Sequence, residues 1–161
     1  MEVRNKVTSI AFDLNVAKLT VVGVPDRPGI AASIFESLAS AGISVDTIVQ
    51  NASIDNITDL TFTVAKSDLA KAMEVVGPIA KSIGARECVG DSKLGKISII
   101  GTGMQNTPGF AARMFGTLSE LDINIQLITT SEIRITCIIS ATEVKKAVRA
   151  LHRTFELEIP E

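Results

Sequence analysis

The hydrophobic residues of this chain switch between the two-residue period of a β-strand and the spacing of an amphipathic helix. In the first half, an apolar run rich in β-branched residues leads into a Pro-Gly pair, and apolar residues then recur every three or four positions. Two strand-like runs, a second helical stretch and a last strand-like run follow. The pattern predicts strands over residues 18–24, 43–51, 58–65 and 84–89 and helices over residues 29–41 and 67–82.

The second half of the chain repeats the first. Pro28–Gln50 aligns with Pro108–Thr130 at an offset of 80 positions, and eight of the 23 pairs are identical. The runs on either side correspond in the same order, which indicates an internal duplication. The second half therefore predicts a helix after its own Pro-Gly pair, a further helix over residues 142–154, and strands over residues 96–101, 123–130 and 133–140.

The order of elements, βαββαβ, predicts an α+β protein of two ferredoxin-like modules. Each module is expected to have a four-stranded antiparallel sheet with two helices on one face. The second copy has no good last strand, because Phe155–Glu161 is short and contains a proline. Val7–Leu14, in contrast, forms a strand that the first copy does not need. We therefore predict a first module over residues 15–92, inserted into a second module over residues 93–161 that the N-terminal strand 5–14 completes.

Four positions predict where helices begin and end. Gly42 follows the first helix where a C-terminal glycine is expected, and Asp122 takes this place in the second copy. Ser67 and Thr142 precede the later helix of each copy. Their hydroxyl groups predict N-caps that accept a bond from the first unpaired N–H groups.

The Pro-Gly turns are the candidate binding sites. A helix start carries unpaired N–H groups and a partial positive charge, which favour a carboxylate or a phosphate. Gly29 and Gly109 let a ligand approach the backbone, and Asp26 in the first loop can hold a ligand ammonium group. This combination indicates a site for a free amino acid. Spacing alone somewhat favours the plainer alternative, in which Pro-Gly is only a turn and Asp26 is a solvated or capping residue.

Composition excludes several classes of function. Sixteen basic and 18 acidic residues give a net charge of −2, which argues against a nucleic-acid-binding protein. No apolar run approaches the length of about 18 residues that a membrane span needs. Cys88 and Cys137 have no CxxC partner and are expected to be small core residues in a reducing compartment. The chain is therefore expected to be cytoplasmic, without a disulfide or a metal site.

A catalytic constellation is not found in the sequence. The loop Gly101–Gly109 lacks the lysine and the spacing of a phosphate-binding loop. The lone His152 is expected to lie at the surface or to face the dipole of the last helix. The same helix carries four basic residues that are expected to form a solvated face: Lys145, Lys146, Arg149 and Arg153. We therefore expect a binding protein and not a catalyst.

Four segments resemble the regulatory region of aspartate kinase, which consists of tandem ACT domains. They are Phe12-Asp13, Ala17–Gly29, Asp46–Asn51 and Thr129–Ile135. The resemblance covers essentially the whole chain, and the last segment, Thr-Thr-Ser-Glu-Ile-Arg-Ile, is quite specific. It does not include the amino-acid kinase domain that would carry catalysis. The chain is therefore similar to a separate β subunit or an excised regulatory fragment.

The resemblance implies feedback control of the ATP-dependent phosphorylation of aspartate, the first step toward lysine, threonine and methionine. It implies threonine, lysine or both as effectors, a homodimer, and a catalytic kinase subunit or domain as partner. ATP and magnesium would belong to the kinase domain, so no cofactor is expected in this chain. A stand-alone amino-acid-sensing ACT protein and a structural dimerisation module remain alternatives.

The resemblance also implies two groups of effector-binding residues. In the first group, Gln50 closes the loop from the second strand, and Asn124 and Ile125 come from the other module. The whole group is Asp26, Arg27, Pro28, Gly29, Ile30, Ala31, Gln50, Asn124 and Ile125. The second, related group comprises Phe110, Ala111, Ser44, Val45, Asp46, Ser131 and Glu132. Phe110 and Ala111 stand where small or hydroxyl residues can occur in relatives, and Asn106-Thr107 replaces the acid of the first loop. These departures leave the occupancy and the ligand of the second site open.

Overall fold

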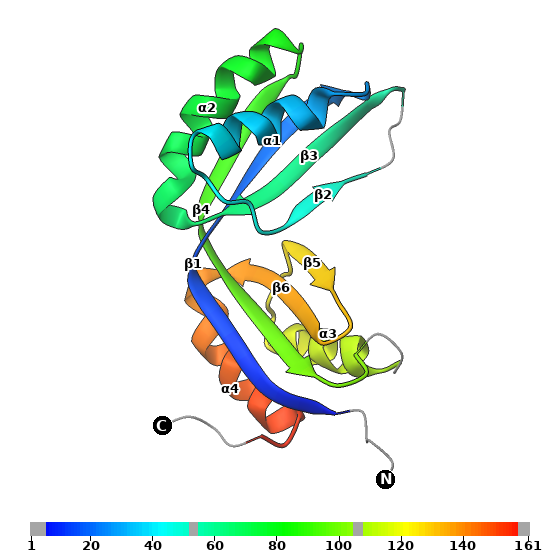
Figure 1. Cartoon of the computed structure of the whole chain (residues 1–161). Helices are drawn as coiled ribbons and strands as arrows, with labels where there is room; N and C mark the ends of the chain where they lie inside the picture. The colour runs from blue at the N-terminus through cyan, green and yellow to red at the C-terminus, as the bar shows by residue number, and fades with distance from the viewer. Residues whose placement is uncertain (1–5, 52–54, 105–107, 158–161) are drawn as a thin grey trace. The chain divides into compact units, whose positions relative to one another are not determined.

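The computed structural model describes residues 6–51, 55–104 and 108–157 (Figure 1). The chain divides into two compact units. The first unit is Asn15–Ser92, and the second combines the segment that ends at Leu14 with the segment that begins at Lys93. Strands β1 (Val7–Pro25) and β4 (Glu87–Gly101) are long enough to contribute to both units.

The first unit packs two helices on a four-stranded sheet. The helices are α1 (Ile30–Ser40) and α2 (Leu69–Ser82), and the strands β2 (Ile48–Gln50) and β3 (Ile57–Val64) join parts of β1 and β4. The strand order is β2-β3-β1-β4, and β3 runs antiparallel to both β1 and β2. The core between sheet and helices includes Leu19, Val21, Ile34, Leu38, Leu60, Phe62, Ala72 and Val76.

The second unit has the same architecture. It contains α3 (Phe110–Glu120), β5 (Leu127–Thr130), β6 (Arg134–Ser140) and α4 (Val144–Thr154), with the strand order β1-β4-β6-β5. The predicted α+β class, with antiparallel sheets covered by helices, is thus confirmed. The core includes Ile97, Ile99, Met114, Leu118, Ile135, Cys137, Ile139, Val144, Ala147 and Leu151.

The N-terminal part of β1 belongs to the sheet of the second unit. Val7 is buried in the core of that unit, and Ile10 packs against it. The Lys6 carbonyl accepts a hydrogen bond from the Thr102 N–H at 3.0 Å. The contact is so close that a Cβ built on Gly101 would lie 2.1 Å from the Lys6 oxygen. A glycine is therefore required where the two segments meet.

Two strand predictions differ from the structure in length. The runs predicted separately over residues 7–14 and 18–24 form one strand, β1, which continues through Asn15. The runs predicted over 84–89 and 96–101 likewise join within β4. The strands predicted over 43–51 and 123–130 are shorter than expected, since only the last residues of each run, in β2 and β5, enter the ladder.

The predicted helix C-termini are confirmed. Gly42 has a φ of 75° and Asp122 a φ of 58°, so both are in the left-handed conformation that ends a helix. In each copy the residue that follows donates its N–H to a carbonyl five positions back, from Ile43 to Leu38 and from Ile123 to Leu118, both at 3.0 Å. These bonds satisfy the last carbonyl groups of α1 and α3.

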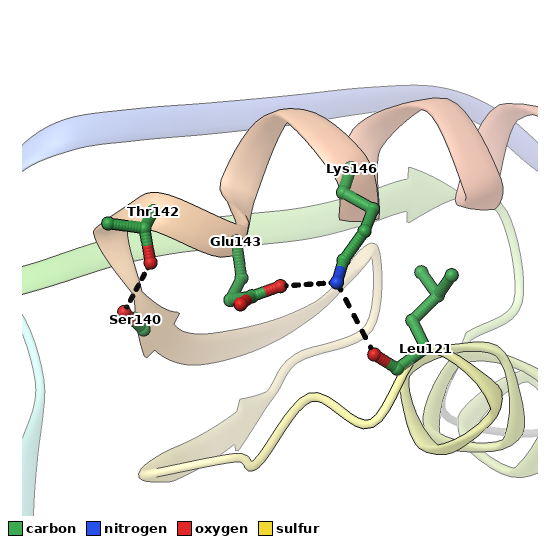
Figure 2. Close-up of polar contacts among 5 residues, drawn as sticks. All are labelled: Leu121, Ser140, Thr142, Glu143 and Lys146. Carbon is green, nitrogen blue, oxygen red and sulfur yellow. Dashed lines mark hydrogen bonds and ion pairs between the residues drawn. The ribbon is translucent and has the colours of Figure 1, made fainter.

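The predicted N-caps at Ser67 and Thr142 are wrong. Short 3₁₀ turns over Lys66–Asp68 and Ala141–Glu143 precede the α-helices, so the α-helices begin later than predicted. Neither helix has a side-chain hydrogen bond at its cap. The Thr142 hydroxyl instead lies 3.1 Å from the Ser140 hydroxyl (Figure 2).

Two cationic side chains tie α3 and α4 together at opposite ends. Figure 2 shows Lys146 Nζ, which lies 2.7 Å from the Glu143 carboxylate and donates to the Leu121 carbonyl at 3.4 Å, at the C-terminus of α3. In the reverse direction, Arg113 of α3 donates to the Thr154 carbonyl at the C-terminus of α4. A positive charge at a helix C-terminus is favourable, so each helix stabilises the end of the other.

Candidate functional site

The loop between β1 and α1 presents an uncapped helix N-terminus. Gly29 begins the helix with a φ of 91°, a conformation that glycine adopts without strain. The first bond inside the helix joins the Ser33 N–H to the Gly29 carbonyl at 3.0 Å, and no side chain caps this end. The N–H groups of Ala31 and Ala32 precede that bond, so they can bind an anion.

Asp26 stands at the entrance of this loop. Its backbone N–H donates to the Asn56 carbonyl at 2.8 Å, and the next N–H, of Arg27, donates to the Pro25 carbonyl at 3.1 Å. These bonds fix the Asp26 backbone, while its side chain is exposed and contacts no polar group among the described residues. The carboxylate can therefore bind an ammonium group of a ligand.

Gln50 lies at the same end of the sheet as Asp26. Both β1 and β2 run antiparallel to β3, so their last residues reach the same edge. Gln50 pairs with Leu60, which also pairs with Val21 of β1. The exposed Gln50 side chain thus belongs to the sheet end from which the Asp26 loop leaves.

Ser44, Val45 and Asp46 lie at the other end of α1. They follow the C-terminus of that helix, and its 11 residues span about 16 Å. Ser44 and Asp46 are exposed, whereas Val45 packs against the core. Within the first unit, the structure therefore separates these residues from the Asp26 loop, as their assignment to two different sites requires.

The start of α3, in the second unit, has the same backbone geometry as the start of α1. Gly109 has a φ of 105°, and the first intrahelical bond joins the Arg113 N–H to the Gly109 carbonyl at 2.9 Å. The Phe110 side chain is buried in the core beside Phe155, and Ala111 is half-buried. A ligand at this helix start would therefore meet mainly the backbone. The residues Asn106 and Thr107 lie outside the described part of the chain.

Asn124 and Ile125 line a hollow of about 210 Å³ at the C-terminal end of α3. Its other lining residues are Phe115, Ser119, Asp122 and Ile123. Ser131 and Glu132 lie in the exposed turn between β5 and β6. The Glu132 carbonyl accepts a hydrogen bond from the Met104 N–H at 3.1 Å. This bond connects the turn to the residues that follow β4.

Cys137 is a core residue, as predicted, and Cys88 packs against the core of the first unit. Cys137 is fully buried, and burial raises the pKa of its thiol to about 12. Cys88 is half-buried with its sulfur 3.8 Å from that of Met73, and burial also raises its pKa. Because the thiolate is the nucleophilic form, neither side chain has the character of a reactive cysteine at neutral pH.

Of the two positions expected for His152, the surface position is wrong, whereas the residue does lie in the last turn of α4. The side chain is buried, and Nδ1 lies 2.8 Å from the Val148 carbonyl. Position 152 falls on the buried stripe of α4, next to Leu151. The four basic residues of this helix are exposed, which confirms the predicted solvated face: Lys145, Lys146, Arg149 and Arg153.

The raised pKa of Cys137 makes stability depend on pH above about 9. An unfolded thiol has a pKa of about 8.5. The stability that burial of the neutral thiol contributes is fully present below that value and is lost as the pH rises toward 12. We expect the free energy of unfolding to fall by up to about 1.4 kcal/mol per pH unit more than in Cys137→Ala. Urea denaturation at pH 8 and pH 10 measures this difference, and parallel profiles would contradict it.

Comparison with known proteins identifies the fold family. The family model for the ACT domain matches twice, over residues 19–77 and 97–155. The chain belongs to the ACT-domain family. The first ACT domain lies in the unit that carries Asp26 and Gln50, and the second in the unit that carries Phe110 and Asn124.

The relatives of this tandem ACT chain are aspartokinases. An aspartokinase of Pseudomonas aeruginosa is 47% identical over 154 residues, which are 96% of this chain and 37% of the relative. The chain thus spans little more than a third of that enzyme. The regulatory subunit of aspartate kinase from Thermus thermophilus, solved without ligand, is 40% identical with a TM-score of 0.87, and the match covers 92% of this chain and 98% of that one.

A structure of aspartokinase alpha and beta subunits contains a chain that is 44% identical, with a TM-score of 0.87. The match covers 94% of this chain and 99% of that one. The tandem ACT domains are therefore a regulatory region of the aspartokinase family. Among the described residues, no helix is both long and apolar enough to cross a membrane, and no cluster of His, Cys, Asp and Glu fits a metal ion.

Proposed function

We propose that this chain is the allosteric regulatory part of an aspartate kinase and that it binds threonine, lysine or both as feedback inhibitors. The observation that carries the proposal is the exposed Asp26 carboxylate beside the uncapped start of α1. A free amino acid carries an ammonium group and a carboxylate, and this arrangement offers a group of opposite charge to each. The aspartokinase relatives indicate which reaction such binding regulates.

The proposed first site uses backbone and side chains for different parts of the ligand. The backbone N–H groups at residues 29–31 are assigned to the α-carboxylate, with Ala31 as the main donor because the Ile30 N–H also donates to the Arg27 carbonyl at 3.4 Å. Asp26 is assigned to the ammonium group. Gln50 binds the side chain of the ligand from the end of β2. Asn124 and Ile125 of a second copy complete the site, so that the effector is shared within a homodimer.

The second site follows the same plan around Phe110 and Ala111. Ser44, Val45 and Asp46 would face it together with Ser131 and Glu132. Because Asn106-Thr107 replaces the acid of the first loop, the helix start there offers backbone contacts without an acid like Asp26. We therefore assign the stronger amino-acid binding to the first site.

Regulation requires two arrangements of the modules that bind the effector differently. A coupling free energy of about 1–3 kcal/mol between two sites corresponds to a change in binding affinity of about 5- to 150-fold. The ligand supplies this energy through contacts that exist in one arrangement only. The catalytic partner, a separate kinase subunit or a kinase domain of the same cytoplasmic enzyme, would respond to the change.

A dye-based thermal melt with each of the twenty amino acids tests the proposal. Intrinsic fluorescence is unsuitable because the chain has no Trp and no Tyr. A ligand at about 100 times its dissociation constant stabilises the folded state by about 2.7 kcal/mol, which raises the melting temperature by several degrees. We expect a selective rise with threonine or lysine. A flat response to all twenty would favour a structural dimerisation module.

A further inference from the structure

Strand β1 contains a bulge directly before the effector loop. Val21 pairs with Leu60 of β3, and Val24 pairs with Thr58, so two residues of β1 stand opposite Asp59 alone. Gly23 is one of these two residues and has a φ of 70°. Its N–H donates to the Asp59 carboxylate oxygen Oδ1 at 3.0 Å. The Asp59 side chain thus accepts a hydrogen bond from the N–H group that the bulge leaves without a partner in the ladder.

The bulge decides which face of the sheet the following residues occupy. Side chains alternate between faces along a regular strand, so residues three positions apart lie on opposite faces. Val21 and Val24 are three apart, yet both are buried in the same core. The extra residue therefore shifts the alternation by one position. Pro25 and Asp26 follow the bulge, so the face to which their side chains point is also shifted by one position. The direction of the Asp26 side chain therefore depends on the bulge.

Two further hydrogen bonds connect the bulge to the rest of the proposed site. The Asp26 N–H donates to the Asn56 carbonyl at 2.8 Å, which docks the loop on the residues that precede β3. The Thr58 hydroxyl, opposite Val24, donates at 2.9 Å to the carbonyl of Asn51, the neighbour of Gln50. The segment from Asn56 to Asp59 thus forms bonds to the Asp26 loop, to the bulge and to the end of β2.

The second repeat lacks this arrangement. Strands β4 and β6 pair in register from Leu94 and Ser140 to Ile100 and Arg134. Gly101, which aligns with Gly23, has no positive φ, and its N–H donates to the Ile133 backbone carbonyl at 2.9 Å instead of to a side chain. The duplication aligns Arg134 with Asp59, so a basic residue replaces the carboxylate. The bulge and the Asp59 carboxylate that accepts its hydrogen bond therefore occur in the repeat whose loop contains Asp26.

We propose that Asp59 is a positioning residue for the effector site of the first ACT domain. Its carboxylate accepts a hydrogen bond from the Gly23 N–H, which stabilises the bulge. The bulge in turn sets the direction of the Pro25 and Asp26 side chains. Asp59 does not touch the ligand. This proposal rests on the proposed function, because it concerns the same amino-acid site. Sequence reasoning missed it, although a glycine inside a strand run is the usual signal of a bulge.

Calorimetric titration of the whole chain with L-threonine and L-lysine tests this role. We expect Asp59→Ala to weaken binding of the effective amino acid about 3- to 10-fold, the range of one net hydrogen bond. Asp59→Asn keeps an acceptor oxygen and is expected to retain the wild-type affinity within about twofold. Glu74→Ala removes an exposed carboxylate of the same unit and is the matched control, with no expected change.

Amide hydrogen exchange in the ligand-free proteins gives an independent readout. We expect the N–H groups of Gly23 and Asp26 to exchange about 3- to 10-fold faster in Asp59→Ala and at the wild-type rate in Asp59→Asn. Wild-type exchange and affinity in Asp59→Ala would overturn the positioning role, as would an Asp59→Asn protein as impaired as Asp59→Ala. If the wild-type chain binds neither amino acid, the proposed function itself fails, which the wild-type titration alone reveals.

Discussion

Asp26→Ala is expected to weaken effector binding about 10- to 100-fold without unfolding the protein. A hydrogen bond to a charged group contributes about 1.5–3 kcal/mol, and each 1.4 kcal/mol is a factor of ten in affinity. The Asp26 side chain is exposed and contacts no polar group among the residues that the structure describes. The free energy of unfolding should therefore change by less than about 0.5 kcal/mol. Calorimetry with threonine and lysine measures the affinity, and urea denaturation the stability.

Glu36→Ala is the matched control for this change. Glu36 is an exposed carboxylate on α1, so its loss changes the net charge of the unit equally. Binding to Glu36→Ala should equal that of the wild type. Unchanged affinity of a well-folded Asp26→Ala protein would remove Asp26 from the site, and an equal loss in Glu36→Ala would attribute the effect to net charge.

Gly101→Ala is expected to destabilise the second unit by about 3 kcal/mol, near the upper end for overpacking. The added Cβ would lie 2.1 Å from the Lys6 carbonyl oxygen. This neighbour is backbone, so no side-chain rotation relieves the contact. On the other side, the Gly101 N–H is bound to the Ile133 carbonyl at 2.9 Å. The chain can respond only by separating the N-terminal part of β1 from β4.

Gly116→Ala provides the control for this substitution. Gly116 lies inside α3 of the same unit, and nothing lies within 4 Å of a Cβ built there. The change to alanine should stabilise the protein by about 0.5–1 kcal/mol, because alanine is the better helix former. Urea denaturation compares the two variants. Equal stabilities would contradict the close packing of the N-terminal segment on Gly101.

The sequence predicted the fold well because the duplication made each pattern visible twice. Hydrophobic spacing located the four α-helices of the described residues within a few positions, and Gly42 and Asp122 marked two of their ends. Strand lengths were less predictable. Periodicity does not show where a run stops pairing, so the strands predicted over 43–51 and 123–130 proved to be short. The 3₁₀ turns that displace the caps at Ser67 and Thr142 leave no signal in spacing.

The candidate site could be predicted only in part. The Pro-Gly pairs identified the starts of α1 and α3, because helix termini follow general rules of backbone geometry. The contribution of Asp59 depends on the register of β1 against β3, which is a property of the folded sheet. The burial of His152 likewise depends on which stripe of α4 meets the core. Neither the role of Asp59 nor the burial of His152 follows from the residue type alone.

The central claim is that an amino acid bound to this chain controls an aspartate kinase. The most direct test measures the phosphorylation of aspartate by ATP with the aspartokinase catalytic chain of the same organism, purified together with this chain. The account predicts that threonine, lysine or both inhibit the reaction, and that Asp26→Ala shifts the inhibiting concentration upward about 10- to 100-fold. Kinase activity that neither amino acid changes, in a complex that contains the wild-type chain, would contradict it.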